Sequence, residues 1–268
     1  MSFHRKLVLF SSCLAAAALA LFQTGCGQFK AQGRTVVVKL SPDVKLRLVY
    51  VEQLKMFVGK YEVSNAEFRC FRPQHSSGAH EGLNLNDASQ PAVNVSWNDA
   101  HAFCDWLNRN HSATPAGKLK FRLPKVREWE TYATCGTGSE YPWGAWPPPK
   151  RFNYFGRENR SPGGQMLDHN DGHRVSAPVR KSGENDWGLY GVGGNVWEWC
   201  EDKDAEMPAM NVLKGASWAD SMPLFLSTSR NSAYEPAYKY VNLGFRVVAD
   251  PAEGEPVSSP KPAKTSGE

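Results

Sequence analysis

Two histidines and two aspartates lie close together in the stretch DHNDGH. His169 and His173 are four residues apart, and on a helix that spacing would place both imidazoles on one face, where they could chelate a transition metal. Asp168 and Asp171 stand beside them, but Gly172 and the polar surroundings indicate a loop. We therefore interpret the histidines as polar loop residues, with a metal site as the alternative.

A carboxylate stands between two indoles in the segment GLYGVGGNVWEWCED, residues 188–202. Successive side chains of a strand point to opposite sides, so Trp197 and Trp199 share one side and Glu198 takes the other. We expect the indoles to pack in the core and Glu198 to bind a cation or a buried arginine. Arg246, in the segment NLGFRVV, is predicted to form a buried structural pair.

The cysteines show no obvious metal-binding motif. Cys13 falls in an N-terminal apolar run and Cys26 follows that run, whereas the other four lack the Cys-x-x-Cys spacing of zinc sites. Four cysteines allow three disulfide pairings, and the sequence does not choose among them. We expect structural disulfides or buried thiols, with a redox-active pair as the alternative. The four are Cys70, Cys104, Cys135 and Cys200.

The first residues have the pattern of an export signal. A basic start, HRK, precedes the apolar run LVLFSSCLAAAALALF, which is followed by QTGC. The ending resembles a bacterial lipobox, although Gln23 is unusual there, so residues 1–26 are predicted to be a lipoprotein-type signal peptide with Cys26 as the lipidated residue. This places the protein in the bacterial cell envelope, anchored to a membrane. Cleavage near Ala20, giving a periplasmic or secreted protein, and a retained anchor are the alternatives.

Composition favours a loop-rich folded domain with no nucleic-acid partner. The chain has 268 residues, 12% of them aromatic, with 23 glycines and 18 prolines, which favours an α+β or β architecture over a helical bundle. The net charge is +4, and Arg5 and Lys6 of the predicted signal contribute two of the positive charges. Because no basic stripe is present, nucleic-acid binding is not predicted.

The pattern along the chain predicts one globular unit between two irregular ends. Residues 27–45 form a lead-in with one β-rich run, residues 46–249 form the domain, and 250–268 form a disordered tail rich in Pro, Ser, Lys and Glu. Helices are predicted after the capping pairs Ser64/Glu67 and Ser96/Asp99, and a third after Pro124. Residues 136–186 lack a regular pattern, and a loop of that length is usually functional or held by ions or packing.

Nine short segments match, in order, the sulfatase-modifying-factor family, whose founding members are formylglycine-generating enzymes. The resemblance covers residues 46–249 and implies a single compact α+β domain with a formylglycine-generating-enzyme fold, which is C-type-lectin-like and has little regular secondary structure. A glycine-rich loop that usually precedes GKYEV is missing, so the rim of any pocket should differ. The segments are GKYEVSNAEF, PAVNVSWNDAHAFCDWLN, FRLPKVREWE, YPWG, DGHRVSAPV, DWGLYGVGGNVWEWCED, KGASW, Arg230 with Pro236, and NLGFRVV.

The resemblance also locates a pocket for copper chemistry. In the enzymes, two cysteines bind copper(I) and, with oxygen, convert a substrate cysteine to formylglycine. Alignment on KGASW puts Asp220 and Phe225 at those positions, whereas Ser217 is retained. A carboxylate and a phenyl ring cannot replace the thiolates that copper(I) requires. The oxidase activity is therefore predicted to be absent and copper is not expected, with no catalytic residue assigned and Ser217, Trp218 and Asp220 as pocket candidates.

The resemblance further implies structural calcium, which prefers six to eight oxygen ligands. A first site maps onto the side chains of Asn153 and Asp171 and the backbone oxygens of Tyr154 and His173. Ordinary turn hydrogen bonding is the alternative at these positions.

A second calcium site maps onto the backbone oxygens of Gly194 and Val196 and the side chain of Glu198. Its remaining ligand falls on Gly191, which has no side chain. This second site is therefore expected to be impaired.

Three functions remain open from the sequence. The first is a cell-envelope binding or assembly module, with an unidentified protein or glycan partner and no oxidase activity. The second is a divergent oxidase that modifies a protein cysteine, as in sulfatase maturation. The third is a glycan-binding module in which Trp143, Trp146 and Trp218 stack on sugar rings.

Overall fold

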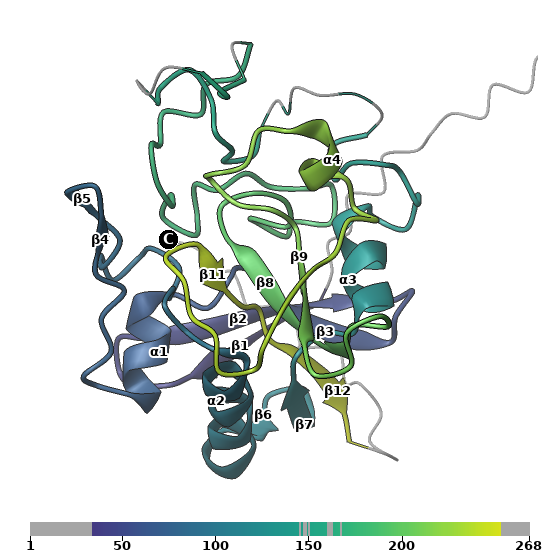
Figure 1. Ribbon diagram of the computed structural model, residues 1–268. Helices are drawn as coiled ribbons and strands as arrows, with labels where there is room; N and C mark the ends of the chain where they lie inside the picture. Colours follow the sequence, from purple (N-terminus) through teal and green to yellow (C-terminus); the bar gives the residue numbers. More distant parts are fainter. Residues whose placement is uncertain are drawn as a thin grey trace, which may run out of the picture.

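A six-stranded antiparallel sheet forms one layer of the fold (Figure 1). The computed structural model describes residues 34–252 except 145, 147, 148, 150, 160–162 and 167. In order across the sheet, the strands are β1 (Thr35–Lys39), β2 (Lys45–Val51), β3 (Met56–Gly59), β12 (Val248–Pro251), β7 (Gly117–Arg122) and β6 (Ala113–Thr114). Val248 of β12 pairs with Val58 on one side and Arg122 on the other. The last strand, β12, therefore lies between β3, from the N-terminal part of the chain, and β7, from its middle.

The folded unit extends beyond both boundaries suggested by the sequence. β1 pairs with β2 along its whole length, from Thr35 opposite Val49 to Lys39 opposite Lys45. Val36 and Val38 are buried, as the two-residue period requires, so this part of the expected lead-in belongs to the sheet. At the other end, β12 continues to Pro251. The predicted signal peptide, Cys26 and most of the predicted tail lie outside the described residues.

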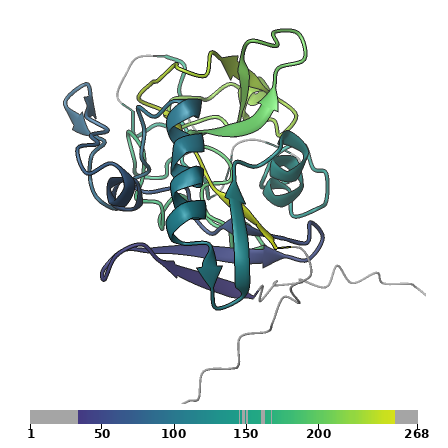
Figure 2. The same ribbon diagram turned by 90° about the horizontal axis from the view of Figure 1, so that it is seen from below.

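The three predicted helices are present. α1 (Asn65–Phe71) and α2 (Trp97–Asn110) each begin with a complete capping box, Ser64 with Glu67 and Ser96 with Asp99. α3 (Val126–Ala133) begins two residues after Pro124. Figure 2 shows α2 and α3 on the same side of β1 and β2. A short fourth helix, α4 (Pro223–Leu226), was not anticipated.

A second sheet has four strands, and the candidate functional site lies beside it. Its order is β10 (Ser232–Tyr234), β9 (Asn211–Lys214), β8 (Trp197–Lys203) and β11 (Leu243–Gly244), and β11 runs parallel to β8. A separate hairpin pairs β4 (Ala79–His80) with β5 (Leu83–Asn84). Between α3 and β8, the described residues contain no helix or strand, which confirms the predicted long irregular segment.

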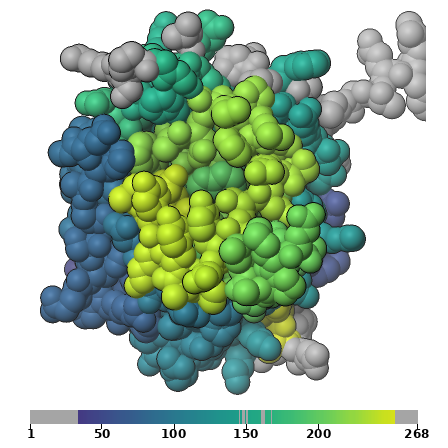
Figure 3. Space-filling model, viewed as in Figure 1, coloured from purple at the N-terminus to yellow at the C-terminus, as the bar shows by residue number. Residues whose placement is uncertain are grey.

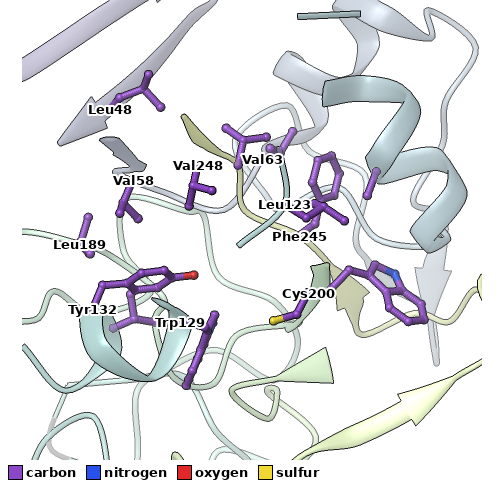
Figure 4. Close-up of a cluster of buried hydrophobic side chains, with 14 of the residues drawn as sticks. Leu48, Val58, Val63, Leu123, Trp129, Tyr132, Leu189, Cys200, Phe245 and Val248 are labelled. Carbon is purple, nitrogen blue, oxygen red and sulfur yellow. The ribbon is translucent and has the colours of Figure 1, made fainter. Parts of the chain in front are cut away.

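One hydrophobic core joins the two sheets and the helices. Figure 4 shows Leu48, Val58 and Val248 of the large sheet near Tyr132 and Trp129 of α3, and all five are buried. This shared core explains why so little regular structure forms a single compact domain. In the described part of the chain, no helix is long and apolar enough to cross a membrane.

The four cysteines of the domain are free thiols and form no disulfide, and the prediction of buried thiols holds for two of them. Cys104 and Cys200 are buried, and Cys70 and Cys135 are half-buried. Burial raises the pKa of all four thiols, that of Cys135 to about 11. Thiols with raised pKa values hold little thiolate at neutral pH and are poor nucleophiles and metal ligands.

Candidate functional site

A hollow of about 430 Å³ opens beside the four-stranded sheet. Trp197, at the start of β8, lines it together with Asp220, Phe225 of α4 and Arg230. Figure 3 shows this face, where the yellow-green and yellow segments after β9 surround a hollow with darker green atoms from an earlier part of the chain at its base. The two positions at which the resemblance would place cysteines therefore line the same hollow.

Asp220 is held by three donors that converge on one of its oxygens. Its Oδ2 accepts hydrogen bonds from the Ser217 hydroxyl at 2.6 Å, the Ser217 N–H at 2.9 Å and the Trp197 indole N–H at 3.0 Å. Among the described residues, no hydrogen bond reaches Oδ1, which leaves that oxygen available to the hollow. Burial raises the pKa of Asp220, although the same hydrogen bonds oppose the shift. The carboxyl group is thus fixed by residues that are not themselves charged.

Three exposed tyrosines form a row along the hollow. The rings of Tyr234 and Tyr238 stack with centroids 4.4 Å apart and an angle of 12° between planes, and Tyr240 lies nearly parallel at 6.3 Å from Tyr238. All three line the hollow. Stacked and exposed aromatic rings offer a platform for an apolar or aromatic part of a ligand.

The other pocket candidates have different positions. Ser217 is fully buried behind Asp220, where Asn242 also donates to its hydroxyl at 2.9 Å. Trp218 lines an adjoining hollow of about 280 Å³, and Tyr240 and Asn242 form the wall between the two hollows. Ser217 therefore positions Asp220, and Trp218 faces a different space.

The three tryptophans proposed as a sugar-binding surface do not form one. Trp218 is only 4% exposed and packs in a small core cluster with Val196, so the sequence-based proposal for this residue is wrong. Trp143 is half-buried and stacks on Tyr141 with centroids 5.0 Å apart. Of the three, only Trp146 is largely exposed, at 81%.

The residues of the first predicted calcium site are brought together and fit a hard cation. Asn153 is buried, and its Oδ1 has no hydrogen-bond partner within the described residues. Asp171 contacts the backbone of the next residue, since its Oδ2 accepts the N–H of Tyr154 at 3.1 Å, and its Oδ1 accepts that of His173 at 2.8 Å. A buried acceptor without a donor is costly unless something binds it. Asn153 and Asp171 would supply side-chain oxygens, and Tyr154 and His173 the backbone oxygens.

His169 also contacts this group of residues. Its ring is buried, with Nδ1 2.9 Å from the carbonyl oxygen of Pro149 and Nε2 2.9 Å from Asp171 Oδ2. Burial alone would lower the pKa of His169, but the bond to Asp171 outweighs burial and the net pKa is raised. Across the described residues, no group of three or more His, Cys, Asp or Glu side chains is placed to hold a metal ion.

Glu198 of the second predicted calcium site pairs with a buried arginine. Its Oε1 lies 2.6 Å from Arg246 Nη2, its Oε2 accepts the Trp129 indole N–H at 2.9 Å, and both partners are fully buried. Arg246 also donates to the carbonyl oxygens of Gly59 and Tyr190. The predicted buried pairing of Arg246 is confirmed. Because the fully buried Arg246 already pairs with the Glu198 carboxylate and occupies the cationic position beside it, the side chain does not fit the role of a calcium ligand.

A second buried carboxylate explains the glycine at position 191. Glu62 lies so close to Gly191 that an added Cβ would stand 2.1 Å from Glu62 Oε1. Asn195 donates to the same oxygen at 2.7 Å, while Oε2 has no partner in the described part of the chain. Burial raises the pKa of Glu62 to about 7. The space that a ligand side chain at Gly191 would need is thus filled by Glu62, which further disfavours the second calcium site.

Sequence reasoning missed Glu62, Asn195 and the row of tyrosines. Asn195 has a φ of 58°, and its Oδ1 accepts from Asn153 Nδ2 at 3.0 Å while its Nδ2 reaches Glu62. An asparagine after two glycines was the available signal, because asparagine adopts positive φ more readily than most residues. Tyr238 carried no such signal, since tyrosines in a polar loop have no periodicity.

Comparison with solved structures defines the class of fold. The Treponema denticola variable protein 1 matches 81% of this chain and 99% of its own, at 20% identity and a TM-score of 0.61. PvdO from Pseudomonas aeruginosa matches 81% of this chain and 92% of its own, at 17% identity and a TM-score of 0.57. These likenesses establish the fold, which is formylglycine-generating-enzyme-like and C-type-lectin-like.

The chain belongs to the sulfatase-modifying-factor family. The model of the sulfatase-modifying factor enzyme 1-like domain matches residues 31–251. The inactive C-alpha-formylglycine-generating enzyme 2 of Bos taurus is 40% identical over 148 residues, covering 54% of this chain and 42% of the relative. The formylglycine-generating enzyme of Streptomyces coelicolor is 35% identical over 181 residues, covering 60% and 53%. The chain spans about half the length of these curated relatives.

Proposed function

We propose that this protein is a cell-envelope binding or assembly module that lacks copper-dependent formylglycine-generating activity. The observation that carries the proposal is the hollow beside the four-stranded sheet, where Asp220 and Phe225 stand and the described lining residues include no cysteine. Copper(I) needs soft ligands, and a carboxylate with a phenyl ring offers none. The four cysteine thiols of the domain lie outside the lining of this hollow, and burial raises their pKa values.

The relatives support the proposal without deciding it. Sequences similar to this chain include proteins named as formylglycine-generating enzymes and proteins named as inactive. The family fold therefore exists with and without the activity. Whether one member has the activity depends on the residues at its site. The proposal predicts that copper, oxygen and a peptide containing Cys-x-Pro-x-Arg leave the peptide thiol unchanged, as mass spectrometry would show.

The proposed location rests on the N-terminal sequence. A basic start, an apolar run and Gly25-Cys26 favour export and lipidation of Cys26 in the cell envelope. A membrane anchor at Cys26 would place the domain where a protein or glycan partner could be reached. Fractionation of cells expressing the full chain tests this: a Cys26→Ser variant that remains in the membrane fraction would contradict it.

Calcium is proposed as a structural ion at Asn153 and Asp171. The unpartnered buried Oδ1 of Asn153 and the adjacent Asp171 carboxylate support this assignment. When bound, calcium would supply positive charge and hold the long segment between α3 and β8 in place. Glu198 is not proposed as a ligand, because Arg246 and Trp129 engage it.

Removing calcium should lower the melting temperature. A ligand at a hundredfold excess over its Kd stabilises the folded state by about 2.7 kcal/mol, which corresponds to several degrees for a domain of this size. Differential scanning calorimetry with EDTA or excess calcium measures the shift. The Asp171→Asn variant should lose most of the shift, whereas Asp168→Asn, an exposed neighbour, should retain it. Equal melting temperatures of the wild-type protein in EDTA and calcium would contradict the assignment.

A further inference from the structure

The hollow beside the four-stranded sheet contains two charged groups that pair with no described residue. Asp220 Oδ1 faces no described donor, and no lysine, arginine or histidine of the described chain lies within 4.0 Å of the Asp220 carboxylate. Arg230 stacks on Phe225, with its guanidinium carbon 5.5 Å from the ring centroid, and likewise has no described carboxylate within 4.0 Å. The hollow thus presents a separate negative and positive group.

The two groups differ in how firmly they are held. Three hydrogen bonds fix the Asp220 carboxylate, so an ammonium group would meet a preorganised acceptor. Arg230 is exposed at the rim, and its planar guanidinium is suited to a carboxylate. Trp197 and the stacked tyrosines line the same hollow and provide apolar contact area.

From this arrangement we propose that the hollow binds a small zwitterion, an amino acid or a short peptide, with its ammonium group on Asp220 and its carboxylate on Arg230. The inference rests on the proposed role of the domain as a binding module, and it names the class of ligand. A volume of about 430 Å³ is within the range of small-molecule sites. The adjoining hollow, which shares Tyr240 and Asn242, offers room for a second residue. A neutral glycan would use the rings but neither charge.

The Asp220→Asn variant tests the ammonium contact without disturbing the fold. An asparagine carbonyl can accept the same three donors that now reach Oδ2, while its NH2 group replaces the free oxygen. Arg230→Gln is the matched variant for the carboxylate contact, and Arg230 is exposed. Melting curves of both variants show whether the fold is retained.

The probes are L-phenylalanine and the dipeptide Ala-Phe, each also N-acetylated and also C-amidated, measured by isothermal titration calorimetry on the full chain. For the wild-type protein, loss of either charge should weaken binding about tenfold or more, because hydrogen bonds to charged groups are stronger than those between neutral groups. Acetylation should have little effect with Asp220→Asn, and amidation little effect with Arg230→Gln. Comparing the affinity of the amino acid with that of the dipeptide shows whether the hollow prefers a free amino acid or a short peptide.

Three results would overturn this inference. They are equal binding of the free and acetylated probes, equal binding by wild type and Asp220→Asn, and absence of binding by both free probes at millimolar concentration. If Asp220→Asn failed to fold, comparing the free and amidated probes on the wild-type protein and on Arg230→Gln would still test the inference. Failure of the proposed function is distinguishable, because it would appear as oxidation of a peptide thiol.

Discussion

Replacing Arg246 with methionine should destabilise the domain by about 3–5 kcal/mol, a large part of the stability of a typical domain. Arg246 is fully buried, and its guanidinium donates hydrogen bonds to both oxygens of Glu198. Methionine fills similar space but leaves Glu198 as a buried carboxylate without a cation. Glu62, the second buried carboxylate nearby, would also lose the positive charge that favours its ionised form. Urea denaturation followed by tryptophan fluorescence measures the loss.

The control for this prediction is Arg230→Met. Arg230 is exposed and its guanidinium is stacked on Phe225, so the same substitution there should change the free energy of unfolding by about 0.5 kcal/mol or less. A similar small effect at Arg246 would show that the buried pair is not required for stability. Combining Arg246→Met with Glu198→Gln should recover part of the loss, because the unpaired charge is then removed.

Replacing Gly194 with alanine should destabilise the domain by about 2–5 kcal/mol, combining left-handed backbone strain with overpacking. Gly194 has a φ of +72°, and a Cβ there would stand 2.2 Å from the backbone oxygen of Asn153. The backbone of Asn153 cannot move freely, because its carbonyl oxygen accepts the Asn195 N–H at 2.6 Å. Thermal unfolding of the purified variant gives the measurement.

Gly82 separates the two causes of this effect. Its φ is +76°, close to that of Gly194, but nothing lies within 4 Å of an added Cβ. Gly82→Ala should therefore show only the backbone strain, about 1–2 kcal/mol. If the two alanine variants were equally stable, close packing of Gly194 against Asn153 would not contribute. A larger loss for Gly194→Ala is the predicted result.

Local signals in the sequence were sufficient for the three longer helices but not for α4. Ser64 and Ser96 each precede an acidic residue by three positions, and both form the capping boxes that this spacing indicates. The strand at Thr35–Lys39 was visible as a β-rich run, but its membership of the sheet was not. Pairing with β2 is a tertiary contact, and the run alone does not show which strand it joins.

The candidate site was predictable only in part. Alignment on a local motif predicted one pocket for Asp220 and Phe225, and both residues line the same hollow. The partner of Glu198 could not be chosen, because Arg246 is 48 residues away and only the fold brings the two together. Glu62 fills the space beside Gly191 for the same reason. Polar networks made by distant segments leave no periodic pattern in the sequence.

The most direct test of the account is the reaction of the purified protein with a cysteine peptide. The full chain is incubated with copper, oxygen and a peptide containing Cys-x-Pro-x-Arg, with the Streptomyces coelicolor formylglycine-generating enzyme as a positive control. We predict that the positive control converts the thiol to an aldehyde, whereas this protein leaves the peptide mass unchanged. Appearance of the aldehyde product with the wild-type chain, and its loss in Asp220→Asn, would contradict the proposal that the hollow is a binding site without oxidase activity.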